Sequence, residues 1–136
     1  MSVIVTDAGF RPDDWQGGFA TLEDGGAPGL DLHPDTDPAA LDRLPEGVEM
    51  VRIAFPSSAD GRGFTLARLL RLRGYRGRLR AHGHVIADQY AMARRCGFDE
   101  VEIDAALAAR QPEEQWRARA HWQAHDYQSR LRGRAA

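Results

Sequence analysis

The sequence predicts an α/β fold with about four parallel strands and alternating helices, in a half-barrel-like or open sheet. Short β-branched or apolar segments recur along the chain, and each is followed by a segment with helical spacing or a helix cap. Strands that alternate with helices favour a parallel sheet with right-handed crossovers. The 136 residues fit one domain. A complete eightfold barrel is excluded because it needs ~250 residues.

The expected elements follow this alternation. The strands are expected at 3–6, 29–32, 50–55, 78–82 and 101–103. The helices are expected from Pro38 onward, at 64–73, 85–96 and 105–110, and from Pro112 to about 131. Asp37 and Asp104 are expected to cap helices at their N-termini. Gly74 and Gly97 are expected to end the helices that precede them.

Three parts of the single domain, 1–136, differ in character. Residues 1–28 are expected to form an irregular N-terminal segment apart from the short strand, with Trp15 and Phe19 packed onto the main body. Residues 29–110 are expected to form the βα core. Residues 111–132 are expected to form one long, polar C-terminal helix whose apolar contacts are Trp116, Ala120 and Tyr127.

Residue usage excludes several classes of site. All 18 basic side chains are arginine, so a Schiff-base lysine and the lysine of a P-loop are excluded. GC-rich codon usage is the simplest cause of that bias. Cys96 is the single cysteine, which excludes an internal disulfide, a Cys-x-x-Cys redox pair and a cysteine-ligated iron–sulfur cluster. No cofactor and no metal are therefore expected, and anions must be bound by guanidinium groups, helix N-termini or backbone N–H groups.

Charge is distributed unevenly along the chain. Residues 1–60 carry 12 acids and 3 arginines, a net charge of −9, whereas residues 61–136 carry 8 acids and 15 arginines, a net charge of +7. This division indicates either a docking face for an acidic partner or ordinary solvated helix faces. Nucleic acid is not an expected partner, because no aromatic platform alternates with the arginines.

The N-terminus lacks the basic start and apolar stretch of a secretory signal peptide. No segment approaches the ~20 apolar residues that span a bilayer. We therefore expect a cytoplasmic protein without a membrane partner.

The segment 55–65 is the first candidate site, because ligands of parallel sheets bind beyond the carboxyl ends of the strands. Gly61 and Gly63 allow close approach of the backbone, and Arg62 offers a bidentate guanidinium group. The alternative is a simple turn in which Asp60 pairs with Arg62. A dinucleotide fingerprint is excluded, because Leu66 stands where its third glycine is required.

The second candidate site is the strand end at 80–84 and the helix that follows. Arg80 and His82 share one face of the strand, so Arg80 should meet a carboxylate, with Asp60 the first candidate, or face a wet site. His82 or His84 is suited to acid–base chemistry near neutral pH. Gln89 is either a site residue or a polar group at a helix start. A structural arginine–aspartate pair with two exposed histidines remains the alternative, and no catalytic residue is assigned.

Two further features allow more than one interpretation. His121 and His125 have the i, i+4 spacing of metal ligands, but a solvated helix face is favoured because no glutamate lies between them. Cys96 lies near Arg94 and Arg95, which would make it reactive, but a buried small hydrophobic residue is favoured.

A series of short motifs resembles a proteobacterial family of uncharacterised proteins. The motifs are Phe55-Pro56, Asp60 to Phe64, Gly74 to Gly83, Val85, Asp88-Gln89, Arg95 to Asp99 and Tyr127-Gln128. Members are typically encoded beside the gene for assimilatory sulfite reductase, and some carry the label of an oxidoreductase of sulfite reduction. The chain departs from the family at Ser57, Ser58, Arg78 and His84.

The resemblance implies a role in sulfur assimilation, and whether the protein is an enzyme is left open. The oxidoreductase label fits the residues poorly, because the chain has no cysteine pair and no dinucleotide fingerprint. We expect an accessory protein that binds sulfite reductase or its electron donor through the arginine-rich second half. One alternative is a small oxyanion-binding enzyme or sensor that uses Arg62 and Arg80. Another is a homo-oligomer with the Trp116 helix at its interface.

Overall fold

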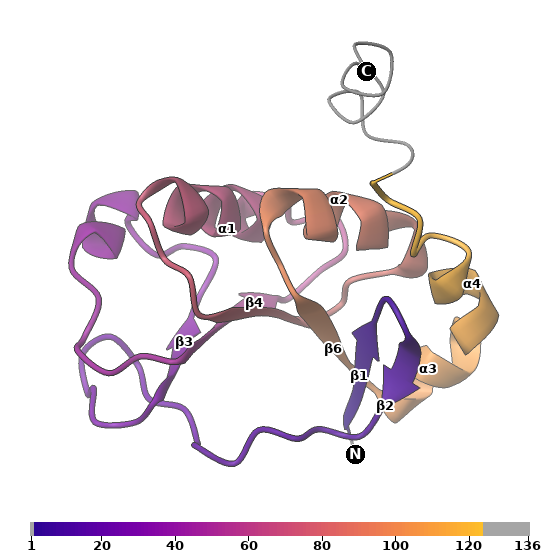
Figure 1. Cartoon of the computed structure of the whole chain (residues 1–136), viewed down its shortest axis with the longest axis horizontal. Helices are drawn as coiled ribbons and strands as arrows, with labels where there is room; N and C mark the ends of the chain where they lie inside the picture. The colour runs from indigo at the N-terminus through magenta and orange to yellow at the C-terminus, as the bar shows by residue number, and fades with distance from the viewer. Residues whose placement is uncertain (1, 124–136) are drawn as a thin grey trace, which may run out of the picture.

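The computed structural model describes residues 2–123 and shows an α/β fold built on one sheet of six strands (Figure 1). The strands are β1 Ser2–Thr6, β2 Gly9–Arg11, β3 Gly29–Leu32, β4 Met50–Phe55, β5 Arg78–Gly83 and β6 Glu100–Asp104. The α-helices are α1 Arg62–Leu72, α2 Tyr90–Cys96, α3 Ala105–Arg110 and α4 Glu113–Arg117. Two 3-10 turns are η1 Pro38–Asp42 and η2 Ala87–Gln89.

The sheet is mixed but mostly parallel, with the order β2-β1-β6-β5-β4-β3. The four strands from β3 to β6 are parallel, as predicted. The expectation of a largely irregular segment over residues 1–28 is wrong in part, because β1 and β2 form a hairpin and β1 pairs antiparallel with β6. The physical reason is that β1 satisfies the backbone groups of the β6 edge, which would otherwise remain unpaired.

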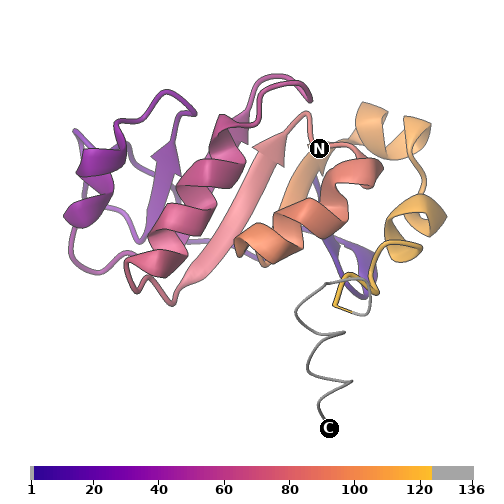
Figure 2. The ribbon, with the colours of Figure 1, turned by 90° about the horizontal axis from the view of Figure 1, so that it is seen from above.

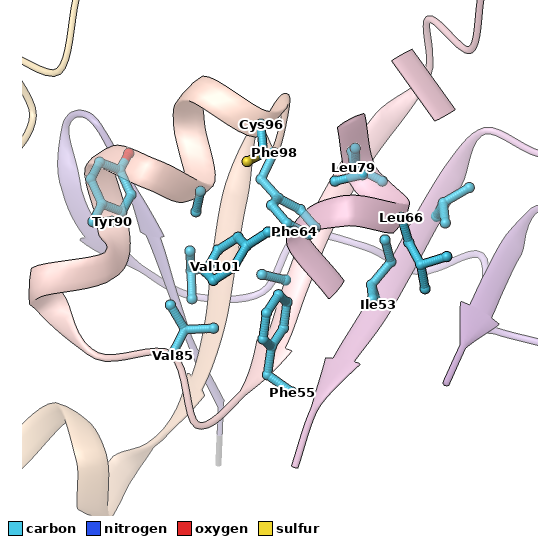
Figure 3. Close-up of a cluster of buried hydrophobic side chains, with 14 of the residues drawn as sticks. Ile53, Phe55, Phe64, Leu66, Leu79, Val85, Tyr90, Cys96, Phe98 and Val101 are labelled. Carbon is cyan, nitrogen blue, oxygen red and sulfur yellow. The ribbon is translucent and has the colours of Figure 1, made fainter. Parts of the chain in front are cut away.

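The helices α1 and α2 lie side by side on one face of the sheet (Figures 1 and 2). Because β4, β5 and β6 are parallel, both helices run back in the opposite direction to the strands. α1 packs on β4, and the buried residues of both helices belong to one hydrophobic core with Val51, Ile53 and Phe55 of β4. Figure 3 shows Phe55, Phe64 and Phe98 in mutual contact there, with the Phe55 and Phe64 ring centroids 4.9 Å apart.

Most predicted helix ends agree with the structure. Asp37 caps η1 by accepting a hydrogen bond from the Ala39 N–H, and Asp104 caps α3 by accepting one from the Leu107 N–H. Gly97 ends α2 in the left-handed conformation, with φ 111°. The helix expected at 85–96 begins later, because Ile86 is still extended and η2 precedes α2.

The long helix expected over 111–132 is wrong within the described residues. Only Glu113–Arg117 is helical there, and turns follow it as far as residue 123. Trp116 explains the arrangement, because it is 1% exposed, packs edge-on against Tyr90 and donates a hydrogen bond to the Gln111 carbonyl. A short polar helix depends on such packing for its stability. The rest of the expected helix, with His125, Tyr127 and Gln128, lies outside the described residues.

None of the helices found within residues 2–123 combines the length and the apolar character needed to cross a membrane.

Candidate functional site

The sheet face opposite α1 and α2 carries a network of ion pairs that we call the charged face. Its members are Arg52, Arg78, Arg80, Glu100 and Glu102 on the strands, with Asp31 on β3 and Asp13 and Asp14 before it. Alternation along each strand explains why charged side chains gather on one face and apolar ones on the other. The burial of Arg80, Glu100 and Glu102 is unusual, because charged groups are rarely buried unless they are paired.

Arg80 occupies the centre of the charged face and has no exposed surface. Its Nε donates to Glu100 Oε2 at 2.7 Å, its Nη1 to Glu102 Oε1 at 2.9 Å and its Nη2 to Asp13 Oδ1 at 3.0 Å. Burial lowers the pKa of Arg80, but these carboxylates outweigh it and raise the pKa above its usual value. The guanidinium group is therefore charged and fully engaged in structural contacts.

Arg52 and Arg78 flank Arg80 and are held in a similar way. Arg52 Nε donates to Asp31 Oδ1 at 2.6 Å, and its Nη1 donates to Glu102 Oε1 at 3.1 Å. The Arg52 guanidinium group lies over the Phe19 ring, with its Cζ 3.7 Å from the ring centroid. Arg78 donates to Glu100 at 2.7 Å and to Asp14 at 2.9 Å. All three arginines on this face are thus neutralised by carboxylates.

The segment between β2 and β3 runs across the charged face (Figure 1). It supplies Asp13 and Asp14, and it places the rings of Trp15 and Phe19 on Arg78 and Arg52. The predicted packing of both aromatic residues onto the main body is confirmed. Sequence reasoning missed the acidic partners of Arg80, although the alternation Glu100-Val101-Glu102 indicated two carboxylates on one face of β6.

The loop at 55–65 forms the local turn that sequence reasoning kept as an alternative. Arg62 donates to Asp60 through Nε at 3.0 Å and through Nη2 at 2.8 Å. The hydrogen bonds from Arg62 lower the pKa of Asp60 to about 2. Gly61 precedes α1, and Gly63 lies so close to the Phe55 ring that a Cβ there would be 2.5 Å from it.

The structure does not bring Arg62 and Arg80 together. Arg62 starts a helix on the apolar side of the sheet, whereas Arg80 is buried on the charged face. They share no partner, because Asp60 binds Arg62 while Asp13, Glu100 and Glu102 bind Arg80. Arg80 meets carboxylates as predicted, but Asp60, the first candidate, is not one of them.

The two histidines lie in different places. The His82 ring is half-exposed on the charged face, with Nε2 3.3 Å from Glu102 Oε2. Burial lowers the pKa of His82, and the attraction of Glu102 opposes this without reversing it. His84 is exposed beyond the carboxyl end of β5.

Gln89 joins two loops near His84. Its amide nitrogen donates to the Ser58 carbonyl at 2.7 Å, and its amide oxygen accepts from the Ile86 N–H at 3.1 Å.

A hollow of about 590 Å³ opens beside the charged face, over β3 and β4. Arg52 and His82 line it, but so do four carboxylic acids, Glu23, Asp31, Asp35 and Asp37. It is therefore unsuited to an anion. Residues 2–123 contain no group of three histidine, cysteine, aspartate or glutamate side chains placed to hold a metal ion.

A smaller hollow of about 290 Å³ lies beyond the carboxyl ends of β4 and β5, and we call it the edge pocket. Its polar lining consists of Ser57, Ser58, His84 and Arg110, and Pro56, Ile86 and Leu107 complete it. His84 and three residues of the candidate segment 55–65, Pro56, Ser57 and Ser58, line it, whereas Asp60, Arg62, Arg80 and Gln89 do not. Sequence reasoning missed Arg110, which lies 26 residues after His84.

Exposed arginine and apolar side chains lie on α1, on α2 and on the connection between α1 and β5. We call this set the helix-layer patch, and it comprises Arg68, Leu72, Arg76, Met92 and Arg95. Leu72 is 75% exposed and Met92 is 48% exposed. Among the described residues these three arginines form no ion pair, whereas their neighbours Arg71, Arg73 and Arg94 do. Cys96 is buried.

Comparison with known proteins identifies a family. A family model described as "Bacterial protein of unknown function (DUF934)" matches residues 29–136. The match includes every strand that contributes an arginine to the charged face, and it leaves out Asp13 and Asp14. No curated protein and no solved structure matches the chain significantly.

Proposed function

The chain belongs to the DUF934 family of bacterial proteins of unknown function, and from that premise we propose an accessory role in assimilatory sulfite reduction. In this proposal the protein binds sulfite reductase or its electron donor through the helix-layer patch. The resemblance to proteins encoded beside the reductase gene motivates the choice of partner.

One contrast between arginines carries the proposal. On the charged face each arginine is neutralised by at least two carboxylates, so that face has no cation to offer a partner. On the helix layer, Arg68, Arg76 and Arg95 are exposed and form no ion pair within residues 2–123. Exposed charges of one sign steer a partner of the opposite sign and raise its association rate.

The apolar members of the patch add a short-range contribution. Leu72 and Met92 are the exposed large hydrophobic side chains of the described residues. An exposed methionine adapts its shape to a partner, and protein interfaces combine apolar side chains with arginine. The partner that fits is an acidic protein surface with apolar side chains at its centre.

The test is a binding measurement with the cognate sulfite reductase and, separately, with its electron donor. The variants are Arg68→Glu and Arg95→Glu, and the control is Arg43→Glu, which makes the same charge change at an exposed arginine outside the patch. We expect each patch variant to slow association by roughly tenfold at low salt, because steering accounts for factors of about 10–1000. Arg43→Glu should bind like the natural protein.

Two results would contradict the proposal. One is the absence of a complex with either partner at both low and moderate salt. The other is an equal loss of binding in Arg43→Glu and in the patch variants. A deletion strain provides an independent check on the pathway, because its growth should fail on sulfate and recover when cysteine is supplied.

A further inference from the structure

The edge pocket is formed by three segments that are far apart in the sequence. The β4–α1 loop contributes Ser57 and Ser58, the connection after β5 contributes His84, and α3 contributes Arg110. In parallel sheets, the carboxyl ends of the strands are where ligands bind. The location is therefore a usual one for a ligand, and Arg110 takes part in it in place of Arg62 and Arg80.

Hydrogen bonds hold the walls of the edge pocket in place without a ligand. The Gln89 side chain joins the Ser58 carbonyl to the Ile86 N–H. Gln111 Oε1 accepts from the Ala87 N–H at 2.6 Å, which ties the end of α3 to the same connection. Gly83 adopts φ 122° and allows the His84 N–H to donate to the Phe55 carbonyl at 2.9 Å. A site organised in advance loses little entropy when it binds a ligand.

The lining groups of the edge pocket are hydrogen-bond donors. Ser57 Oγ accepts from the Ala59 N–H at 3.1 Å, which leaves its hydroxyl proton free to donate. Ser58 adds a second hydroxyl, His84 an imidazole and Arg110 a guanidinium group. No acidic side chain lines the pocket, and within residues 2–123 Arg110 forms no ion pair. The larger hollow beside the charged face differs on this point, since four acids line it.

From this arrangement we propose that the edge pocket binds a small oxyanion. The anion is either a free inorganic ion or the terminal group of a larger molecule such as a phosphate monoester. The volume of about 290 Å³ lies at the lower limit of pockets that enclose drug-sized ligands, which begin at about 300 Å³. Arg110 supplies a positive charge, and the two serines and His84 supply further donors around it. This site shares no residue with the helix-layer patch and does not depend on the proposed docking.

Titration calorimetry of the full chain tests the proposal with sulfite, sulfate, inorganic phosphate and phenyl phosphate as separate probes. The site variant is Arg110→Gln, and Arg43→Gln is the matched control because it removes another exposed arginine that forms no ion pair within residues 2–123. We expect at least one probe to bind, Arg110→Gln to weaken it by roughly tenfold or more, and Arg43→Gln to leave it unchanged. Binding of phenyl phosphate alone identifies the end group of a larger molecule, and binding of the inorganic ions identifies a free oxyanion.

Amide NMR shifts provide a second readout that does not depend on a substitution. Addition of the bound probe should move the amide signals of Ser57, Ser58 and His84. The proposal is overturned if no probe binds at millimolar concentration, if Arg43→Gln weakens binding as much as Arg110→Gln, or if the shifted signals lie elsewhere in the protein.

Discussion

Arg80 is a buried guanidinium group in the middle of a parallel sheet, and its neighbours explain how it is tolerated. The parallel register places Glu100 opposite Arg80 on β6, and Glu102 lies two residues further along the same face. Asp13 approaches from the segment that crosses the charged face. Removing one partner of such a group is costly, because the remaining charge stays buried without compensation.

We therefore predict that Arg80→Met destabilises the protein by about 3–5 kcal/mol, as expected when a buried ion pair loses one partner. Methionine retains much of the length of the side chain, so the loss reports mainly the missing positive charge, which leaves Glu100 paired with Arg78 alone and Glu102 with Arg52 and His82. Urea unfolding followed by circular dichroism measures the effect.

Arg62→Met is the matched control for this experiment. The Arg62 side chain is 58% exposed, and among residues 2–123 it forms an ion pair with Asp60 alone. Exposed ion pairs contribute about 0–1 kcal/mol, so the control should unfold close to the natural protein. Equal losses in the two variants would show that the charged face does not depend on Arg80.

At the scale of elements, the start of α1 is shaped by packing. Gly63 lies against the Phe55 ring, and that ring also contacts Phe64 and Phe98 in the core. Gly61, two residues earlier, has no atom within 4 Å of the place where a Cβ would lie. The two glycines thus have different roles, although only Arg62 separates them.

This difference predicts effects of different size for the same substitution. Gly63→Ala should destabilise the protein by about 1–2 kcal/mol, because overpacking of a core costs about 1–3 kcal/mol and helix propensity returns up to about 1 kcal/mol. Gly61→Ala should stay within about 1 kcal/mol of the natural protein. Thermal unfolding of the two variants is the measurement. A more stable Gly63→Ala variant would mean that the Phe55 ring moves aside at no cost.

The strands show what the sequence could and could not predict. Each parallel strand has a β-branched or apolar segment that ends in turn residues, so β3 to β6 were predictable from local patterns. The segment of β2, Gly9–Arg11, is only three residues long and has no such pattern. The expected C-terminal helix failed because one side chain, Trp116, decides the local packing. Periodicity alone does not contain that information.

The candidate site was predictable in location but not in composition. The carboxyl ends of β4 and β5 do border a pocket, and His84 lines it, but Arg62 and Arg80 do not. Arg110 was missed because its position in the edge pocket depends on the direction that α3 takes after β6. The partner of Arg80 was missed for the same reason, since Asp13 lies 67 residues away in the chain. Contacts between distant segments follow from the tertiary fold, which local residue types do not specify.

The whole molecule has two layers with different charge chemistry. The charged face balances its arginines against carboxylates in the interior, and the helix-layer patch leaves arginines exposed. Burial raises the pKa of Glu102, but the charges of His82 and Arg52 and the hydrogen bond from Arg80 outweigh it and lower the pKa. Hydrogen bonding to Arg80 likewise outweighs burial and lowers the pKa of Asp13. Protonation of these acids therefore opposes folding.

The sign of this linkage predicts how stability depends on pH. Glu102 and Asp13 have folded pKa values below their ordinary values of 4.5 and 3.8, so the unfolded chain binds more protons, and stability falls as the pH drops through that range. The lowered pKa of His82 acts in the same direction. As the pH falls below 6.5, the ordinary pKa of histidine, the imidazole takes up a proton more readily in the unfolded chain than in the folded one. The free energy of unfolding, measured in urea from pH 8 to pH 3, should thus decline gently below about 6.5 and steeply below about 4.5. His82→Gln should remove the gentle part and keep the steep one, because it removes the imidazole and leaves Arg80 with its carboxylates. A stability that is constant or rises on acidification would show that the carboxylates of the charged face do not support the fold as ions.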